Sequence, residues 1–170
     1  MTVFETIQKR YSCRAYQEKE IEKEKLSQLL EAARLAPSAK NLQDWRFVVV
    51  TDKDTKARVA EQTNRPAVFG KAPVIIVACS NSDYVMSSGQ AVAPIDVAIA
   101  LEHICLTATE LGLGTCWLGA FNTENVRQIL GIPADINIVE MLAVGYPAEP
   151  GRQNTREPLE KIICYNKWQF

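Results

Sequence analysis

Two hydrophobic periods alternate along this chain of 170 residues. Apolar residues spaced three and four apart among charged ones indicate amphipathic helices. We expect four such helices, over about residues 3–9, 22–35, 54–62 and 124–130. The first opens with the capping-box spacing of Thr2 and Glu5, and the second stops before Pro37, which cannot continue a helix.

Short runs of β-branched and other apolar residues predict strands between these helices. Residues 47–50 and 74–78 are continuous apolar runs, which are typical of strands covered on both faces. Two more strands are expected, one within the glycine-containing segment 112–121 and one over about 138–144.

The segment from about residue 95 to 111 predicts an unusual helix. Its apolar residues cover most of the helix circumference, so this helix must be buried on nearly every side. In a chain of this size, one route to such burial is to pack against a partner subunit as well as the chain's own sheet. No apolar stretch approaches the ~18 residues that span a bilayer, so we expect no membrane contact.

The composition narrows the class of protein. With 47% hydrophobic and 23% charged residues, the chain matches an ordinary globular protein, and we expect one domain over residues 1–170. Nineteen basic and twenty acidic side chains nearly cancel, which argues against nucleic acid or an anionic membrane as a partner. The first residues lack the apolar region of a secretory signal, so a cytoplasmic location is expected.

Few side chains of the chain are suited to catalysis on their own. The five cysteines are odd in number and widely separated, so we interpret them as reduced structural thiols. His103 is the only histidine and lies within the apolar helix, which favours a structural role over that of a catalytic base. A nucleophile elbow and a P-loop are both missing from the sequence. Enzyme chemistry would therefore come from a bound cofactor.

Basic residues gather just after the first helix. In an extended segment alternate side chains share a face, so Arg10, Ser12 and Arg14 can converge on one ligand while Tyr11 and Cys13 face the core. Guanidinium groups bind phosphate through paired, charge-assisted hydrogen bonds. The segment is either a phosphate site or a solvated basic turn.

A polar loop follows the second helix. Ser38, Asn41 and Gln43 offer uncharged donors and acceptors, as recognition of a heterocycle edge or a polyol requires. The alternative is an ordinary helix stop. Trp45 comes directly before the strand and is interpreted as a core anchor.

The glycines of segment 112–121 follow a helix and lead into a strand, the reverse of a dinucleotide fingerprint. They are better explained as a helix end followed by backbone amides that approach a flat ligand closely. In the tail, Arg152 and Arg156 are either solvated charges or a second pair of phosphate ligands.

Four segments in this order resemble the flavin nitroreductase family. They are RYSCR, APSAKNLQDW, APIDVAIALEHICLTATELGLGTCWLGAF and VGYPAEPGRQNTREPLEKI. The resemblance covers almost the whole chain and implies an α+β sandwich, with a mixed, mostly antiparallel sheet flanked by helices. It also implies a homodimer whose long central helix lies in the interface, and FMN as the cofactor.

The resemblance assigns roles to individual residues. It implies that Arg10 and Ser12 bind the FMN phosphate, that Arg14 reaches the phosphate or the pyrimidine side of the ring, and that Arg156, with Arg152 as a weaker candidate, adds further phosphate contacts. The partner subunit would supply contacts to the ribityl chain and ring from Pro37, Ser38, Asn41 and Gln43. The segment along the isoalloxazine would consist of Trp117, Leu118, Gly119 and Ala120, with an amide near Gly119 or Ala120 directed at flavin N5.

Two departures from the family pattern bear on the substrate. Asp44 stands where the family commonly has proline, so we expect a less rigid loop and a negative charge near the site. The segment 62–71, where larger members build a substrate lid, is short, although Lys71 lies within reach of the ring.

The predicted function is an FMN-dependent NAD(P)H oxidoreductase. NADH or NADPH would reduce the flavin at N5, leave, and be replaced by an acceptor such as a nitroaromatic or a quinone, with no essential side-chain acid or base. The alternative is a module that stores or senses FMN, or a flavoprotein that takes electrons from a partner protein.

Overall fold

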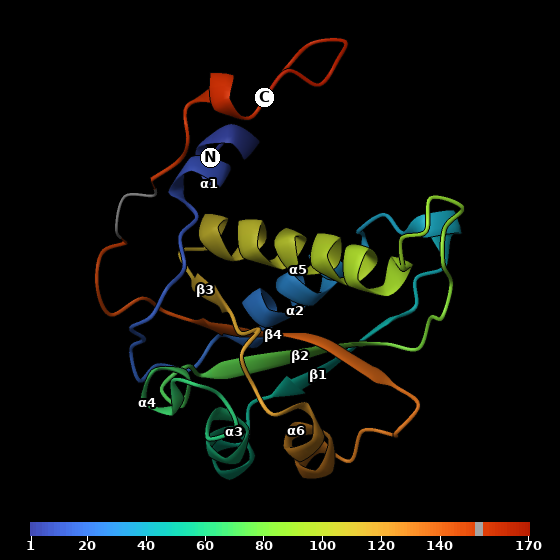
Figure 1. Cartoon of the computed structure of the whole chain (residues 1–170). Coiled ribbons are helices and arrows are strands. Elements are labelled where there is room, and N and C mark those ends of the chain that lie inside the picture. Colours follow the sequence, from blue (N-terminus) through green and yellow to red (C-terminus); the bar gives the residue numbers. More distant parts are fainter. Residues whose placement is uncertain (152–154) are drawn as a thin grey trace.

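A four-stranded sheet forms the centre of the molecule in a computed structural model that describes residues 1–151 and 155–170. The strand order is β1-β2-β4-β3, and all three neighbouring pairs run antiparallel (Figure 1). The strands are β1 (Trp45–Val50), β2 (Val74–Ser80), β3 (Gly114–Trp117) and β4 (Asn137–Gly145). Among the described residues, one isolated bridge from Ser12 to Thr115 adds parallel pairing. The predicted α+β fold with a mostly antiparallel sheet is confirmed.

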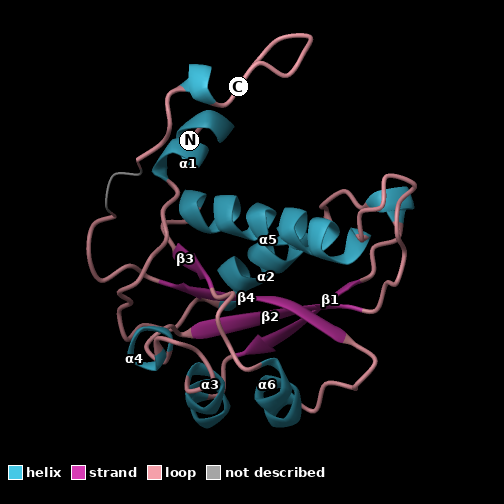
Figure 2. Cartoon of the chain, in the orientation of Figure 1, coloured by secondary structure: helices cyan, strands magenta, loops and turns pink. Residues whose placement is uncertain are grey.

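Helices cover both faces of the sheet (Figure 2). On one face lie α2 (Lys23–Arg34) and α5 (Val92–Glu110). On the other face lie α3 (Lys53–Ala60), α4 (Pro66–Phe69) and α6 (Thr123–Leu130). Each interface has its own apolar cluster, and every residue of β2 is buried between the two clusters. The continuous apolar run in the sequence is therefore explained by a strand with helices on both sides.

Local signals place the ends of several helices as the sequence predicts. At α1 (Val3–Lys9) the Thr2 Oγ1 accepts a hydrogen bond from the Glu5 amide at 3.2 Å, and the Thr2 amide donates to the Glu5 carboxylate at 2.8 Å. At α6 the Asn122 side chain accepts from the Asn125 amide, and Gly131 closes the helix with a φ of 64°. Both ends use the cap chemistry expected of these residue types.

Other boundaries differ from the expectation. Helix α5 begins at Val92, three residues earlier than predicted, because Pro94 falls in its first turn, where the missing N–H costs no helical hydrogen bond. Three short helices were not predicted: α4, η1 (Ala39–Asn41) and η2 (Leu159–Lys161). Each has three or four residues, which is too short to show a hydrophobic period.

Helix α5 has 19 residues and is long and apolar enough to cross a membrane, which corrects the expectation that no stretch approaches that length. Half of an 18-residue stretch of α5 is buried inside the molecule, where the helix packs against α2 and the sheet. The apolar character of α5 is therefore that of a core helix. The single chain nevertheless leaves part of the helix open, with Ile95 40% exposed. The expected burial on nearly every side is therefore not reached within one chain.

Two terminal segments leave apolar side chains in solvent. Helix α1 and the tail with η2 both lie beyond α5, on the side away from the sheet (Figure 1). Phe4 is 68% exposed and Trp168 is 81% exposed. Other exposed apolar residues of these two segments are Val3, Ile7, Leu159, Ile162, Tyr165 and Phe170. An apolar surface of this kind is a candidate site of contact with another molecule.

Candidate cofactor-binding site

The segment after α1 runs along the outer edge of β3. The Cys13 amide donates to the Thr115 carbonyl at 2.8 Å, and Ser12 forms a parallel bridge with Thr115. This pairing turns the Cys13 side chain into the core, where it is buried. Ser12 and Arg14, one residue to either side, face outward, and the alternation predicted for these three residues is confirmed.

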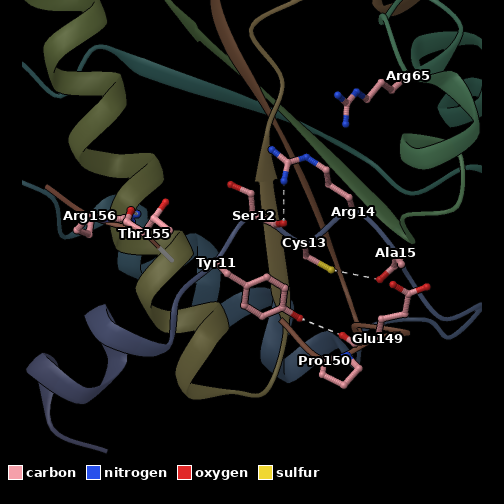
Figure 3. Close-up of a pocket in the computed structure, with 10 residues that line it drawn as sticks. All are labelled: Tyr11, Ser12, Cys13, Arg14, Ala15, Arg65, Glu149, Pro150, Thr155 and Arg156. Carbon is pink, nitrogen blue, oxygen red and sulfur yellow. Dashed lines mark hydrogen bonds between the residues drawn. The ribbon is translucent and has the colours of Figure 1, made fainter. Parts of the chain in front are cut away.

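A cavity of about 720 Å³ opens beside this segment (Figure 3). It is lined by the N-terminal segment, the start of α4 and the chain after β4. The lining residues are Tyr11, Ser12, Cys13, Arg14, Ala15, Arg65, Glu149, Pro150, Thr155 and Arg156. A cavity of this size falls within the range of small-ligand sites.

Three guanidinium groups, from Arg14, Arg65 and Arg156, make the cavity basic. They come from three separate parts of the chain, and Glu149 is the carboxylate among the described lining residues. Guanidinium groups collected in this way suit an anionic ligand such as a phosphate ester.

The Tyr11 side chain is partly buried and packs against the core cluster, as predicted. It lines the cavity, and its hydroxyl donates to the Glu149 carbonyl at 3.3 Å. The ring lies so close to Gly151 that a Cβ there would come within 2.5 Å of it. Tyr11 therefore fixes the chain after β4 at the cavity wall.

Arg10 is directed at α5. Its Nε lies 3.9 Å from a carboxylate oxygen of Glu102, and it is not among the described residues that line the cavity. Burial raises the pKa of Glu102, while the nearby charge of Arg10 acts in the opposite direction. A ligand at this place would have to share Arg10 with Glu102 or replace that carboxylate.

The glycine segment leads away from the cavity along β3. Gly114 approaches the N-terminal segment so closely that a Cβ would lie 2.6 Å from the Cys13 Cβ. After the strand, the Leu118 amide donates to Met141 at 2.9 Å and its side chain is buried. Gly119 and Ala120 are exposed, and the Ala120 carbonyl accepts from the Asn64 amide. The backbone of these two residues is therefore accessible, and its contact with a flat ligand stays a prediction.

The polar loop with Pro37, Ser38, Asn41 and Gln43 lies elsewhere. Its helical turn η1 is at the N-terminal end of α5 (Figure 1). The cavity is lined by the segment after α1, which pairs with β3 just after the C-terminal end of α5. A helix of 19 residues is roughly 28 Å long. One chain therefore does not bring the loop and the arginines together.

Asp44 does not loosen that loop, contrary to expectation. The residue is only 9% exposed, and its Oδ2 accepts a short hydrogen bond from the Ser80 hydroxyl on β2. Asp44 is therefore a buried side chain that ties the loop to β2. Trp45, the next residue, is buried against α5 and α2 as a core anchor, as predicted.

The cysteines and the histidine have structural environments. All five thiols are free; four are buried, and Cys164 is partly exposed. Burial raises the pKa of the Cys13 and Cys116 thiols, and raises that of Cys105 to about 12, so these groups stay protonated. The Nδ1 of His103 lies 3.1 Å from the Ala32 carbonyl and joins α5 to α2.

Sequence reasoning found part of the site. Ser12, Arg14 and Arg156 line the same cavity, whereas Arg152 lies outside the described residues and Lys71 is exposed outside the described cavity lining. Arg65 was missed. It lies within segment 62–71, so the one arginine of that segment was the available signal.

The fold and the cavity define a three-layer α+β protein with a basic cavity at the edge of its sheet. The family model described as Nitroreductase family matches residues 7–65 and 57–146. The chain belongs to the nitroreductase family, as its four segments indicated.

Relatives and solved structures agree with this assignment. A protein of Methanothermobacter thermautotrophicus with the combined name NADH dehydrogenase/NAD(P)H nitroreductase is 34% identical over 173 residues, covering 99% of this chain and 88% of its own. A nitroreductase family protein of Clostridium difficile 630 is 33% identical with a TM-score of 0.90, covering 99% of this chain and 100% of its own. An FMN-dependent nitroreductase of Clostridium difficile R20291 is 30% identical with a TM-score of 0.84, covering 96% and 98%.

Proposed function

We propose that the chain is an FMN-dependent NAD(P)H oxidoreductase that acts as a homodimer in the cytoplasm, with residues 1–170 as one domain. The observation that carries this proposal is the cavity at the edge of β3, which is lined by Ser12, Arg14, Arg65 and Arg156. The names of the relatives support it, since they include NAD(P)H and FMN.

The basic residues of the cavity fit the phosphate of FMN. Arg14, Arg65 and Arg156 present guanidinium groups, and Ser12 adds a hydroxyl on the same side of the N-terminal segment. Arg10 would join them by leaving Glu102, whose raised pKa marks a carboxylate that burial already disfavours. Arg152 is proposed as a further, weaker phosphate contact.

The segment after β3 fits the ring. Trp117 and Leu118 are held in the core, while Gly119 and Ala120 expose their backbone. We propose that a backbone amide of Gly119 or Ala120 contacts flavin N5. No role is assigned to Lys71. FMN, when bound, supplies the hydride chemistry.

The partner subunit completes the site. Because the loop with Pro37, Ser38, Asn41 and Gln43 lies at the far end of α5 from the cavity, it supports contacts to the flavin of the other chain. The open side of α5 and the exposed apolar termini offer the surface for such a dimer. A symmetric pair would place two sites at the interface.

The residues of the cavity bind and orient; none of them has to give or take a proton in the proposed scheme. NADH or NADPH would deliver electrons and depart before a nitroaromatic or quinone acceptor enters. The segment between α3 and β2 carries only the four-residue helix α4, so an open pocket and a broad choice of acceptor are expected.

Anaerobic reduction tests the enzyme directly. The protein is reconstituted with FMN, and its visible absorbance is followed after NADH or NADPH is added. We expect rapid bleaching, followed by recovery of the absorbance when a quinone is supplied. If neither nicotinamide bleaches the flavin while a ferredoxin does, the chain is instead a flavoprotein that depends on a protein donor. A protein that binds FMN but is reduced by neither would be a storage or sensing module.

Arginine substitutions test the site. Arg156→Ala and Arg14→Ala each remove a charged contact to phosphate, so FMN affinity should fall about tenfold or more. Fluorescence titration of the apoprotein measures this. Arg58→Ala, on α3 away from the cavity, is the control and should bind normally. Unchanged FMN affinity in Arg10→Ala would remove Arg10 from the site. Unchanged affinity in Arg10→Ala, Arg14→Ala and Arg156→Ala alike would refute the phosphate assignment.

A further inference from the structure

The loop between α2 and β1 is held in an unfavourable backbone conformation. Lys40, Asn41 and Gln43 all have positive φ, at 50°, 55° and 52°. Residues with side chains avoid this left-handed region because Cβ crowds the backbone. Three such residues within four positions persist only where the surroundings hold them.

One carboxylate holds the loop at its beginning. The Ala39 amide donates to both oxygens of Asp96, at 3.2 and 3.1 Å. Asp96 belongs to α5 and is only 2% exposed. Burial raises the pKa of Asp96, and the charge of Asp44 raises it further, while the bond from Ala39 lowers it.

A second carboxylate holds the end of the loop. Strand pairing sets Trp45 opposite Ser80, which brings the Ser80 hydroxyl to the Asp44 carboxylate. The same hydroxyl accepts from the Ser82 amide at 3.1 Å, so it is fixed on both sides. The other oxygen of Asp44, Oδ1, is buried and has no hydrogen-bond partner among the described residues.

Between these two anchors, the Lys40 ammonium lies 4.3 Å from the Tyr84 ring centre. Arg46 of β1 donates to the Gln43 carbonyl at 3.2 Å. The loop also bonds to itself. The Gln43 amide donates to the Ser38 hydroxyl at 3.0 Å, and the Gln43 side chain donates to the Asn41 carbonyl at 3.2 Å. Such internal bonds shape the turn, but they do not fix it relative to the sheet or to α5. Asp96 and Asp44 hold its two ends against α5 and β2.

We infer that Asp44 and Asp96 are positioning residues that clamp the two ends of the loop, so that Ser38 and Asn41 are presented to the flavin of the partner subunit. The inference rests on the proposed function. Asp44 thus supplies, through a hydrogen bond to β2, a restraint of the kind that proline supplies through its ring.

Coupling between substitutions distinguishes positioning from general stability. Ser80→Ala removes the donor to Asp44 and should weaken FMN binding roughly tenfold. In the double variant with Asn41→Ala, Ser80→Ala should cause little further loss of FMN affinity, because one of the side chains that the loop presents is already missing. Combined with Arg156→Ala, which acts at the far end of α5, its effect should add in full.

Asp44 itself provides an isosteric control. In Asp44→Asn the amide oxygen still accepts from Ser80, so FMN affinity should stay near that of the wild type. Asp44→Ala loses the tether and should match Ser80→Ala. This pair gives an answer even if Ser80→Ala does not fold, and Asp96→Ala tests the other anchor by the same coupling with Asn41→Ala.

The outcomes separate the two proposals. If the wild type binds FMN and Arg156→Ala weakens it, but neither Ser80→Ala nor Asp44→Ala changes the affinity, the clamp is refuted and the function stands. Full additivity of Ser80→Ala with Asn41→Ala also refutes the clamp. If the wild type does not bind FMN, the proposed function itself fails.

Discussion

Gly114 illustrates how much of the site depends on single residues. It is the first residue of β3 and lies against Cys13, whose backbone pairs with the same strand. A side chain at this position would meet Cys13 Cβ at 2.6 Å, Cys13 Sγ at 2.8 Å and Pro147 at 3.1 Å. The absence of a side chain lets the N-terminal segment reach the edge of the sheet and hold Ser12 and Arg14 at the cavity.

We therefore expect Gly114→Ala to be costly. Overpacking of this kind destabilises a core by roughly 1–3 kcal/mol, and it should also displace Ser12 and weaken FMN binding. Urea unfolding of the apoprotein measures the first effect. Gly119→Ala is the matched control for stability, since its Cβ would meet the nearest described atom, of Glu140, at 3.4 Å. Equal stability of the two variants would contradict the packing argument.

At the residue scale, the sequence predicts those side-chain orientations that depend on neighbouring residues in the chain. The alternation of Ser12, Cys13 and Arg14 is local, and it was predicted correctly. The approach of Arg10 to Glu102 was not predicted, because the two residues are distant in sequence. Likewise, nothing near Asp44 in the chain indicates that β2 carries a hydroxyl to bind it.

At the scale of elements, helix α2 begins without a side-chain cap. Its N-cap residue, Glu22, instead accepts a hydrogen bond from the Tyr146 hydroxyl at 2.5 Å, just after β4. Lys25 donates to the same hydroxyl at 2.7 Å, and the Lys19 ammonium lies 3.9 Å from the Tyr146 ring centre. The group ties the start of α2 to the end of the sheet.

This contact should make acid stability depend on Tyr146. The Tyr146 hydrogen bond, helped by Lys19 and Lys25, lowers the pKa of Glu22 from 4.5 to about 2. A carboxyl with a lowered pKa in the folded state contributes stability above its unfolded pKa and loses it as the pH falls. The contribution should therefore be present above about pH 4.5 and disappear toward pH 2.

Tyr146→Phe tests the prediction. Glu22 is exposed, so the effect is expected to be small and to shrink in high salt. The variant should be less stable than the wild type at neutral pH, and the two should converge as the pH approaches 2, by thermal unfolding across that range. Tyr165→Phe, at an exposed residue of the tail, should leave the profile unchanged. A Tyr146→Phe deficit that persists undiminished at low pH would assign the effect to packing.

Long, strongly patterned elements were the most predictable. β2 and α5 are continuous apolar segments, and both occur close to the predicted bounds. The register was not predictable, because the irregularity between Ala78 and Cys79 arises from pairing with β4, some sixty residues on. The distance between the polar loop and the cavity likewise follows from how α5 packs in the fold. The local sequence pattern carries no information on that packing.

At the scale of the whole molecule, the exposed apolar side chains of the two termini are candidate contacts of the proposed dimer. Phe4→Ser and Trp168→Ser remove large apolar side chains from the surface formed by α1 and the tail. We expect each to weaken the dimer and raise the fraction of monomer at low concentration, because less apolar area is buried on association. Analytical ultracentrifugation gives the dissociation constant. Gln128→Ser, on α6 beneath the sheet, is the control; a monomeric wild type would refute the dimer.

The separation of the polar loop from the arginines along α5 has a consequence for mixtures of defective chains. If each site takes its loop from one subunit and its arginines from the other, Asn41→Ala and Arg156→Ala lie on opposite sides of every site. A heterodimer of the two single variants then contains one intact site and one that carries both defects. Co-expression of the two weak binders should restore tight binding in roughly a quarter of all sites, at one flavin per mixed dimer, by random pairing of symmetric subunits. Complementation between subunits would thus reveal, without any structure of the complex, that the two halves of the site belong to different chains.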